Sequence, residues 1–117
     1  MQRRGSTWIP DDDVYFGPIF DDVDVFEAKN LETGLQYVTE WECAVDGGAH
    51  VGSWTRALTK QFKRVYAFEP NVANFGCLIM NAPDAEARRC ALGDRYGVIG
   101  LEGGNNSGCW HIVDGKD

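Results

Sequence analysis

The residues best suited to chemistry lie in a glycine-rich loop and at the end of the strand-like run that follows it. Asp46 opens the loop, and Gly47, Gly48 and Gly52 come after it. Glycine suits a loop that must turn sharply, bring bare backbone close to a ligand and enter a helix at its N-terminus. Glu69 ends the next apolar run, close to the spacing of about 20 residues that favours a carboxylate on a ribose.

The spacing of the glycines separates two classes of cofactor. Dinucleotide-binding loops follow G-x-G-x-x-G, and residues 47–52, GGAHVG, do not fit that pattern. Residues 46–52 fit [D/E]-x-G-x-x-x-G, the pattern of loops that bind S-adenosylmethionine, a ligand without a pyrophosphate. Asp46 would repel a pyrophosphate, but it can attract the ligand's ammonium group directly or through water. No G-K-[S/T] follows, which excludes a P-loop.

Helix and strand patterns alternate around these residues. The predicted elements are a helix over 28–40, a strand over 42–46, a helix capped by Ser53, a strand over 64–69, a helix capped by Asn71 that ends near Pro83, a strand over 86–91, and strands over 98–101 and 109–113 joined by a Gly/Asn-rich turn. This order predicts an α/β fold with a Rossmann-like, doubly wound, mostly parallel sheet, present in part as βαβαβ plus a hairpin. We expect an acidic and aromatic N-terminal arm over 1–28 and an S-adenosylmethionine-binding domain over 29–117.

Three segments carry a resemblance to a known family. They are residues 45–53, VDGGAHVGS, residues 65–71, VYAFEPN, and residues 91–94, ALGD. Together they resemble the FkbM-type methyltransferases, which show a D-x-G-A-N-x-G loop, an F-E-P-x strand end and a short A-L-G/S-D segment. The resemblance covers about residues 42–113. It implies a Rossmann-like fold, an S-adenosylmethionine cofactor and O-methylation of a small or saccharide-like acceptor.

The expected site combines the loop, the strand end and the third motif. The residues expected at the cofactor are Asp46, Gly47, Gly48, Ala49, His50, Gly52, Glu69, Pro70, Ala91 and Leu92. By family position, the last two would border the adenine. The catalytic residue stays open: the pKa of His50 would suit a base, but a role in shaping the pocket is favoured.

The sequence departs from the family pattern in two places. His50 stands where the family usually has Asn. The family also continues with a K-I-D-x-E-G-x-E strand beside the cofactor's reactive end, and these 117 residues do not contain that motif. An alternative function therefore stays open, a module that binds S-adenosylmethionine without transferring its methyl group and that sequesters the cofactor or breaks it down.

The negative charge is concentrated in one segment. The net charge is −7, and residues 11–27 hold seven acids and no Lys or Arg. A solvated acidic surface is favoured over a metal site, because the glycine and distal glutamate of a calcium loop are missing. Nucleic-acid binding is not expected, since it needs clustered Lys and Arg. No apolar run approaches the roughly 20 residues of a membrane span, and no signal-peptide pattern follows Met1, so we expect a cytoplasmic protein.

Two further expectations concern apolar and thiol groups. The cysteines lie far apart in the sequence, which favours buried free thiols at Cys43, Cys77, Cys90 and Cys109. A parallel sheet with few strands leaves its first strand at an edge, and this predicts exposed apolar surface at Val45, Trp110 and Ile112. We therefore expect the chain to form a homo-oligomer or to pack its N-terminal arm across the open edge.

Overall fold

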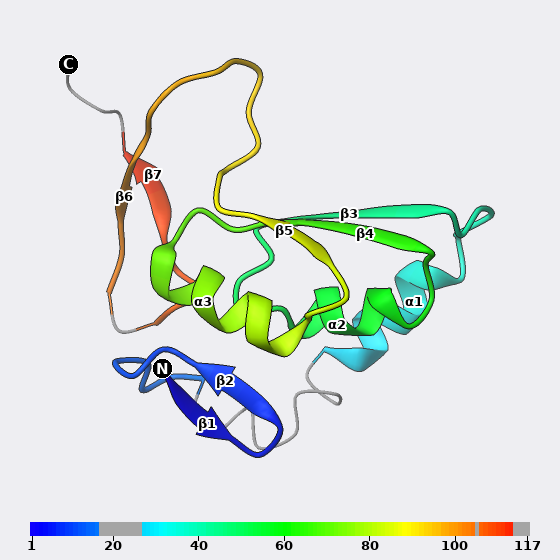
Figure 1. Cartoon of the computed structure of the whole chain (residues 1–117), viewed down its shortest axis with the longest axis horizontal. Coiled ribbons are helices and arrows are strands. Elements are labelled where there is room, and N and C mark those ends of the chain that lie inside the picture. Colours follow the sequence, from blue (N-terminus) through cyan, green and yellow to red (C-terminus); the bar gives the residue numbers. More distant parts are fainter. Residues whose placement is uncertain (17–26, 105, 114–117) are drawn as a thin grey trace.

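The computed structural model describes residues 1–16, 27–104 and 106–113. Its elements in chain order are β1 (Gln2–Arg4), β2 (Thr7–Ile9), α1 (Ala28–Leu35), β3 (Cys43–Gly47), α2 (Ser53–Thr59), β4 (Arg64–Phe68), α3 (Val72–Asn81), β5 (Glu86–Arg88), β6 (Gly100–Glu102) and β7 (His111–Val113) (Figure 1). They form a three-stranded sheet and two two-stranded sheets.

The three-stranded sheet is parallel and has the order β3-β4-β5. Helix α2 connects its first two strands and helix α3 connects the next two. The predicted βαβαβ order and the α/β class are therefore confirmed. The expected hairpin is present as well, because β6 and β7 pair antiparallel with Gly100 opposite Val113.

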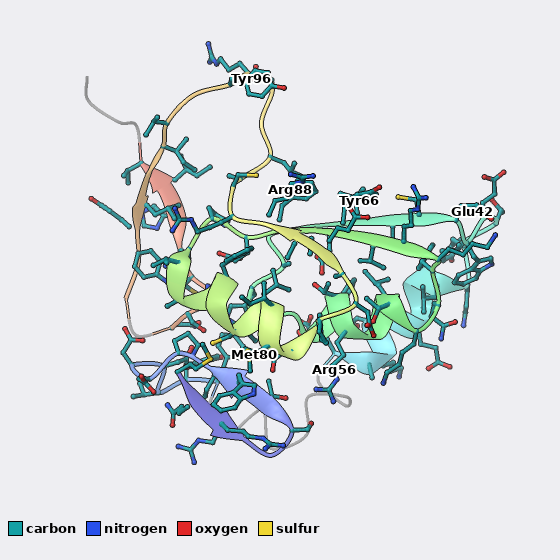
Figure 2. The ribbon with its side chains drawn as sticks, viewed as in Figure 1. Glu42, Arg56, Tyr66, Met80, Arg88 and Tyr96 are labelled. Atoms are coloured by element: carbon teal, nitrogen blue, oxygen red, sulfur yellow. The ribbon has the colours of Figure 1, made fainter. Side chains whose placement is uncertain are left out.

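The two faces of this sheet differ in what covers them. Val65 and Ala67 of β4 are buried on the face against which α2 and α3 lie (Figure 1). Tyr66 and Arg88 point to the opposite side, away from both helices (Figure 2). Val45 pairs with Tyr66 in register, so it shares that open face, and its side chain is 61% exposed. The expected exposure of apolar groups is confirmed at this position.

Helix α3 buries a different stripe from the expected one. Apolar spacing favoured a face made of Val72, Phe75, Leu78 and Ile79. The buried residues are Asn74, Cys77, Leu78 and Asn81. Val72 and Ile79 are exposed. The expectation is confirmed for Leu78 and for Phe75, which packs against the buried cluster around Leu78, and it is wrong for Val72 and Ile79. Asn74 and Asn81 are buried instead because their amides donate to backbone carbonyl oxygens, which offsets the cost of removing an amide from water.

The N-terminal arm begins with structure that its sequence did not indicate. Strands β1 and β2 form an antiparallel hairpin, and Ile9 packs with Val51 and Cys77 in a buried cluster. Asn81 holds the hairpin on α3: its Oδ1 accepts from the Trp8 amide at 2.7 Å, and its Nδ2 donates to the Trp8 and Val51 carbonyl oxygens at 2.8 and 2.7 Å.

The N-terminal arm is expected to pack on the domain, and residues 1–9 do so as a hairpin. The hairpin lies on the side of α3 away from the sheet (Figure 1). It does not cross the open edge at β3, and residues 17–26 of the arm lie outside the described residues. Packing beside α3 buries Ile9 completely.

The predicted start of a helix is confirmed where a side chain caps it. Asn71 caps α3 as predicted, since its Oδ1 accepts from the amides of Ala73 and Asn74 at 3.0 Å each. Ser53 does not cap α2, because it is the first residue of the helix; the N-cap position is Gly52, which has φ 89° and no side-chain cap. The first predicted helix is shorter than expected and ends at Leu35.

The cysteines are mostly exposed. Cys77 is buried, whereas Cys43, Cys90 and Cys109 are exposed free thiols. The expected burial is wrong for these three because β3 is an edge strand and the other two lie in loops outside the core.

Candidate functional site

A pocket of about 420 Å³ opens at the carboxyl ends of β3 and β4. Seven of the ten expected cofactor residues line it, namely Gly47, Gly48, His50, Glu69, Pro70, Ala91 and Leu92. The opposite wall consists of Asn74, Leu101, Ser107, Gly108, Trp110 and Ile112. The fold therefore brings three separated segments of the sequence to one hollow, and it adds a second wall from α3 and the β6–β7 hairpin.

The glycine loop needs its glycines for two different reasons. Gly48 and Gly52 have φ 76° and 89°, a left-handed region that favours glycine. A Cβ on Gly48 would meet nothing within 4 Å, so the backbone there is bare. A Cβ on Gly52 would lie 2.8 Å from Leu78 Cδ1. Because Gly52 has no side chain, the loop can pack against α3, and Gly52 does not line the pocket.

Hydrogen bonds to the Glu69 carboxylate hold the glycine loop in place. Its side chain is 5% exposed. One carboxylate oxygen, Oε2, accepts from the His50 amide at 2.8 Å, and the other, Oε1, accepts from the Asn71 amide at 2.9 Å. A carboxylate has about four acceptor positions, so each oxygen retains capacity for a ligand hydroxyl. Glu69 thus joins the glycine loop to the start of α3 in addition to lining the pocket.

Asp46 lies in a smaller hollow of about 190 Å³ on the other side of the loop, which Ala49 also lines. Gly48 and His50 line both hollows, so the two are separated only by the glycine loop. Asp46 Oδ2 accepts from the Thr55 hydroxyl at 2.6 Å. Burial raises the pKa of Asp46, and the bond from Thr55 partly offsets that rise.

A second acid and an aromatic ring complete the smaller hollow. Glu27 and Trp54 line it, and the Trp54 indole N–H donates to Glu27 Oε2 at 3.1 Å. This hollow therefore combines two carboxylates with an aromatic side chain, a setting that suits a positively charged group.

His50 is part of the pocket wall. It has φ 54°, and its Nε2 lies 2.6 Å from Ser107 Oγ. The ring centroid is 4.9 Å from that of Phe16, with the two planes inclined by 53°. Burial lowers the pKa of His50 to about 4, although the charge of Asp13 acts to raise it. The ring is therefore neutral at pH 7 and packed between the arm and the hairpin.

Asp13 was expected on a solvated acidic surface, and that expectation is wrong. It is buried. Its Oδ1 accepts from the amides of Tyr15 and Phe16 at 2.9 and 2.7 Å, and its Oδ2 accepts from the Ser107 amide at 2.9 Å. Burial by itself raises the pKa of Asp13, but hydrogen bonds from the Ser107 side chain and from backbone amides lower it more. Asp11 does remain exposed, paired with the amino group of Met1.

Asn74 and Ser107 are the two pocket residues with polar side chains that the sequence did not indicate as ligand contacts. Asn74 Nδ2 donates to the Ser107 carbonyl oxygen at 2.8 Å. The buried Asn74 Oδ1 has no hydrogen-bond partner among the described residues. The sequence predicts a Gly/Asn-rich turn at Ser107, and helical periodicity gives no sign that a polar residue on α3 faces inward.

Residues 1–16, 27–104 and 106–113 contain no group of three or more His, Cys, Asp or Glu side chains placed to hold a metal ion. Asp21, Asp22 and Asp24 lie outside the described residues. No helix within those ranges has both the length and the apolar character needed to cross a membrane. Compared with known proteins, the chain matches no family model and no curated protein.

Proposed function

We propose that the chain binds S-adenosylmethionine across its glycine loop and transfers the methyl group to a hydroxyl of a small or saccharide-like acceptor. The observation that carries the proposal is the pocket at the ends of β3 and β4. There the bare backbone at Gly48, the carboxylate of Glu69 and the side chain of Leu92 come from three separate segments to one cavity.

The fold supports this assignment. We infer that β3, β4 and β5 with their two connecting helices are the first half of a Rossmann-like, doubly wound sheet. In open parallel sheets, ligands bind outside the carboxyl ends of the strands. The pocket lies at that edge of the sheet, where the chain passes from β3 into the helix after the loop.

The residues present fit the proposed cofactor. S-adenosylmethionine joins a nucleoside to an amino-acid tail, and the site has two hollows that share Gly48 and His50. The larger has apolar walls at Leu92 and Trp110 and the acid Glu69, which suit a purine and a ribose. The smaller has two acids, among them Asp46, and suits an ammonium group.

Asn74 supplies an independent sign of a ligand. A buried acceptor without a partner costs about 1–3 kcal/mol, and such groups in native structures usually mark a missing partner. Asn74 lines the larger hollow, and its Oδ1 has no partner in the described part of the chain. A nucleoside carries hydroxyl and amino donors, so its binding would supply the class of group that Asn74 lacks.

The bound cofactor would supply an activated methyl group, and the protein would supply alignment. Glu69 would hold the ribose and Asp46 the ammonium, because each carboxylate faces the hollow suited to that group. Fixing donor and acceptor in line provides most of the rate enhancement in such a reaction. The neutral ring of His50 would form part of the wall around the ligand. It is a weak base at pH 7, because its pKa is about 4.

The state of His50 also favours the second candidate, cofactor binding without methyl transfer. Its pKa of about 4 limits proton abstraction, and Ser107 already occupies Nε2. Under this alternative the same two hollows hold S-adenosylmethionine, and the protein sequesters it or breaks it down.

Calorimetric titration tests the cofactor assignment. We expect S-adenosylmethionine and its demethylated product to bind, with no binding of NAD at a similar concentration. Tighter binding of NAD would overturn the assignment. Transfer of a labelled methyl group to a panel of small alcohols and saccharides then separates the two candidates, because the binding module would retain affinity and label no acceptor.

Self-association remains part of the proposal. Val45 is exposed on the open face of the sheet, and Trp110 and Ile112 of the pocket wall are 37% and 55% exposed. Exposed apolar side chains of this size are candidates for burial against a partner. We expect sedimentation to show a concentration-dependent dimer or larger species, which a clean monomer at high concentration would contradict.

A further inference from the structure

Five hydrogen bonds close a ring of residues beside the larger pocket. Glu69 accepts from the amides of His50 and Asn71, at 2.8 and 2.9 Å. His50 Nε2 lies 2.6 Å from Ser107 Oγ. The Ser107 carbonyl oxygen accepts from Asn74 Nδ2 at 2.8 Å, and the Asn74 amide donates to Asn71 Oδ1 at 3.0 Å. The ring joins the glycine loop, the start of α3 and the turn before β7, and four of its five members line the pocket.

Within this ring, the Asn74 carboxamide has one orientation that fits its neighbours. Its Nδ2 donates to the Ser107 carbonyl oxygen, which can only accept, so exchanging Oδ1 and Nδ2 would place two acceptors together. Oδ1 is therefore fixed as the free end of the side chain. It is buried and has no hydrogen-bond partner among the described residues, and Asn74 lines the pocket. A buried acceptor of this kind calls for a donor from a ligand.

The larger pocket has a polar end and an apolar end. A neighbouring hollow of about 680 Å³ shares Leu92, Leu101 and Ile112 with the pocket, but none of the four ring members that line it. The smaller hollow beyond the glycine loop shares His50 instead. The ring therefore lies toward the glycine loop, and the apolar side chains lie toward the outer hollow. A planar base suits the apolar end, and a sugar with hydroxyl donors suits the acceptors of the ring.

We propose that Asn74 is a specificity-determining residue of the pocket. Its Oδ1 accepts a hydrogen bond from one of the two ribose hydroxyls of the bound nucleoside, and the Glu69 carboxylate accepts from the other. The identity of the nucleoside rests on the proposed function, whereas the selection of a sugar diol does not. A carboxylate and an amide oxygen accept hydrogen bonds and donate none. The pair therefore favours a sugar with two free hydroxyls and disfavours one whose hydroxyls carry phosphate.

A single water molecule is the competing partner for Asn74 Oδ1. Asn74 also borders a narrow hollow of about 20 Å³, which Asp13, Asn71 and Ser107 line as well, and a polar hollow of that size has room for one water. The two partners lead to different results. A water would satisfy Oδ1 with or without a nucleoside, so the ligand's hydroxyls would then bind independently of Asn74.

The first test measures the affinity of the full chain for S-adenosylhomocysteine and for its 2′-deoxy and 3′-deoxy forms by calorimetry. We expect both deoxy forms to bind more weakly. The loss should be about three- to tenfold for the hydroxyl that Asn74 accepts, because one neutral hydrogen bond is removed. A wild-type chain that binds both deoxy forms as tightly as the parent compound would overturn the proposal, even if every variant failed to fold.

The second test repeats these titrations with Asn74→Leu, which has a similar shape and no acceptor. One deoxy form should now bind as tightly as the parent compound, because the missing hydroxyl no longer has an acceptor to lose. The other deoxy form should keep its wild-type loss, which reports on Glu69. Asn81→Leu is the matched control, since Asn81 is also a buried asparagine of α3 that donates to a backbone carbonyl oxygen but does not line the pocket.

The control should keep the wild-type loss for both deoxy forms. Wild-type losses for both forms in Asn74→Leu would overturn the proposal and favour the water. S-inosylhomocysteine, whose base lacks the amino donor, covers the remaining partner. If Asn74→Leu removes the difference between this compound and S-adenosylhomocysteine and leaves the hydroxyl losses unchanged, Oδ1 binds the base and the proposal is wrong.

Adenosine and its two deoxy forms separate this proposal from the proposed function, because they carry the sugar and the base without the amino-acid tail. Binding of adenosine with the same dependence on Asn74, but no binding of S-adenosylhomocysteine, would refute the cofactor assignment and leave the diol site standing. Binding of S-adenosylhomocysteine with no loss for either deoxy form would do the reverse. If none of these compounds binds, both proposals fail.

Discussion

The two walls of the pocket are held in place in different ways. The strand-end wall consists of Gly47, Gly48, His50, Glu69, Pro70, Ala91 and Leu92. The amides of Gly48 and Ala49 both donate to the Phe68 carbonyl oxygen, at 2.9 and 3.0 Å. These bonds join the ends of two adjacent parallel strands, so the same pairing that forms the sheet also shapes this wall.

The far wall consists of Asn74, Leu101, Ser107, Gly108, Trp110 and Ile112. It depends on side chains that reach across the fold, and Ser107 is held by Asp13, which lies 94 positions away in the sequence, and by Asn74. We therefore expect substitutions in the strand-end wall to lower both the stability of the fold and the affinity for the ligand. Substitutions in the far wall should lower ligand affinity more than stability.

The largest effect is expected for Glu69→Ala. The change removes the acceptor of two backbone amides and the proposed ribose acceptor. An unsatisfied buried group costs about 1–3 kcal/mol, so we expect the free energy of unfolding to fall by about 3–5 kcal/mol and ligand affinity by about tenfold or more. Chemical denaturation and calorimetry measure the two. Exposed Glu86→Ala is the matched control, and a folded Glu69→Ala protein with wild-type affinity would place the ribose elsewhere.

Substitutions at the two glycines with positive φ should separate the cost of side-chain packing from the cost of backbone conformation. Gly52→Ala adds both an unfavourable φ and a Cβ contact of 2.8 Å with buried Leu78, which predicts a loss of about 2–4 kcal/mol in stability. Gly48→Ala has the φ cost alone and should lose about 1–2 kcal/mol. Thermal unfolding compares them. Equal losses would show that Leu78 moves aside without cost.

Asn81→Asp tests how firmly the arm is held. Aspartate has the same shape and can still accept from the Trp8 amide, but it cannot donate to the carbonyl oxygens of Trp8 and Val51. We expect a loss of about 2–3 kcal/mol in stability, measured by denaturant unfolding, and a smaller change in ligand affinity than for Glu69→Ala. Asn30→Asp on the exposed side of α1 is the control. A fall in affinity without a fall in stability would show that the arm's attachment serves the pocket alone.

Acid should weaken the fold through His50. The folded pKa of about 4 lies below the ordinary value of 6.5, so the unfolded chain binds the proton more readily between these two values. Stability is therefore complete above about pH 6.5 and is lost as the pH falls toward 4, by about 3 kcal/mol. His50→Asn is suitable for comparison because Asn tolerates a positive φ and does not titrate here. Parallel stability curves for the two proteins across this range would refute the shift.

The strand-end wall was predictable because all its parts are local in sequence. The spacing of Asp46, Gly48 and Gly52 and the acid at Glu69 follow from what one loop and two adjacent strands require. The cap at Asn71 was predictable for the same reason, since its partners lie only two and three residues away. The order of the elements then placed these residues at one edge of a sheet.

The far wall could not be predicted from the sequence without the tertiary structure. Hydrophobic spacing does not distinguish a buried Asn74 or Asp13 from an exposed one, because each is buried against Ser107, a partner distant in sequence. The β1–β2 hairpin has three-residue strands, too short to show a period of two. Whether Ser107 closes the pocket, and whether His50 is neutral, depends on how the arm, α3 and the hairpin pack together, because the hydrogen bonds and the exclusion of water that set both arise only in the folded chain.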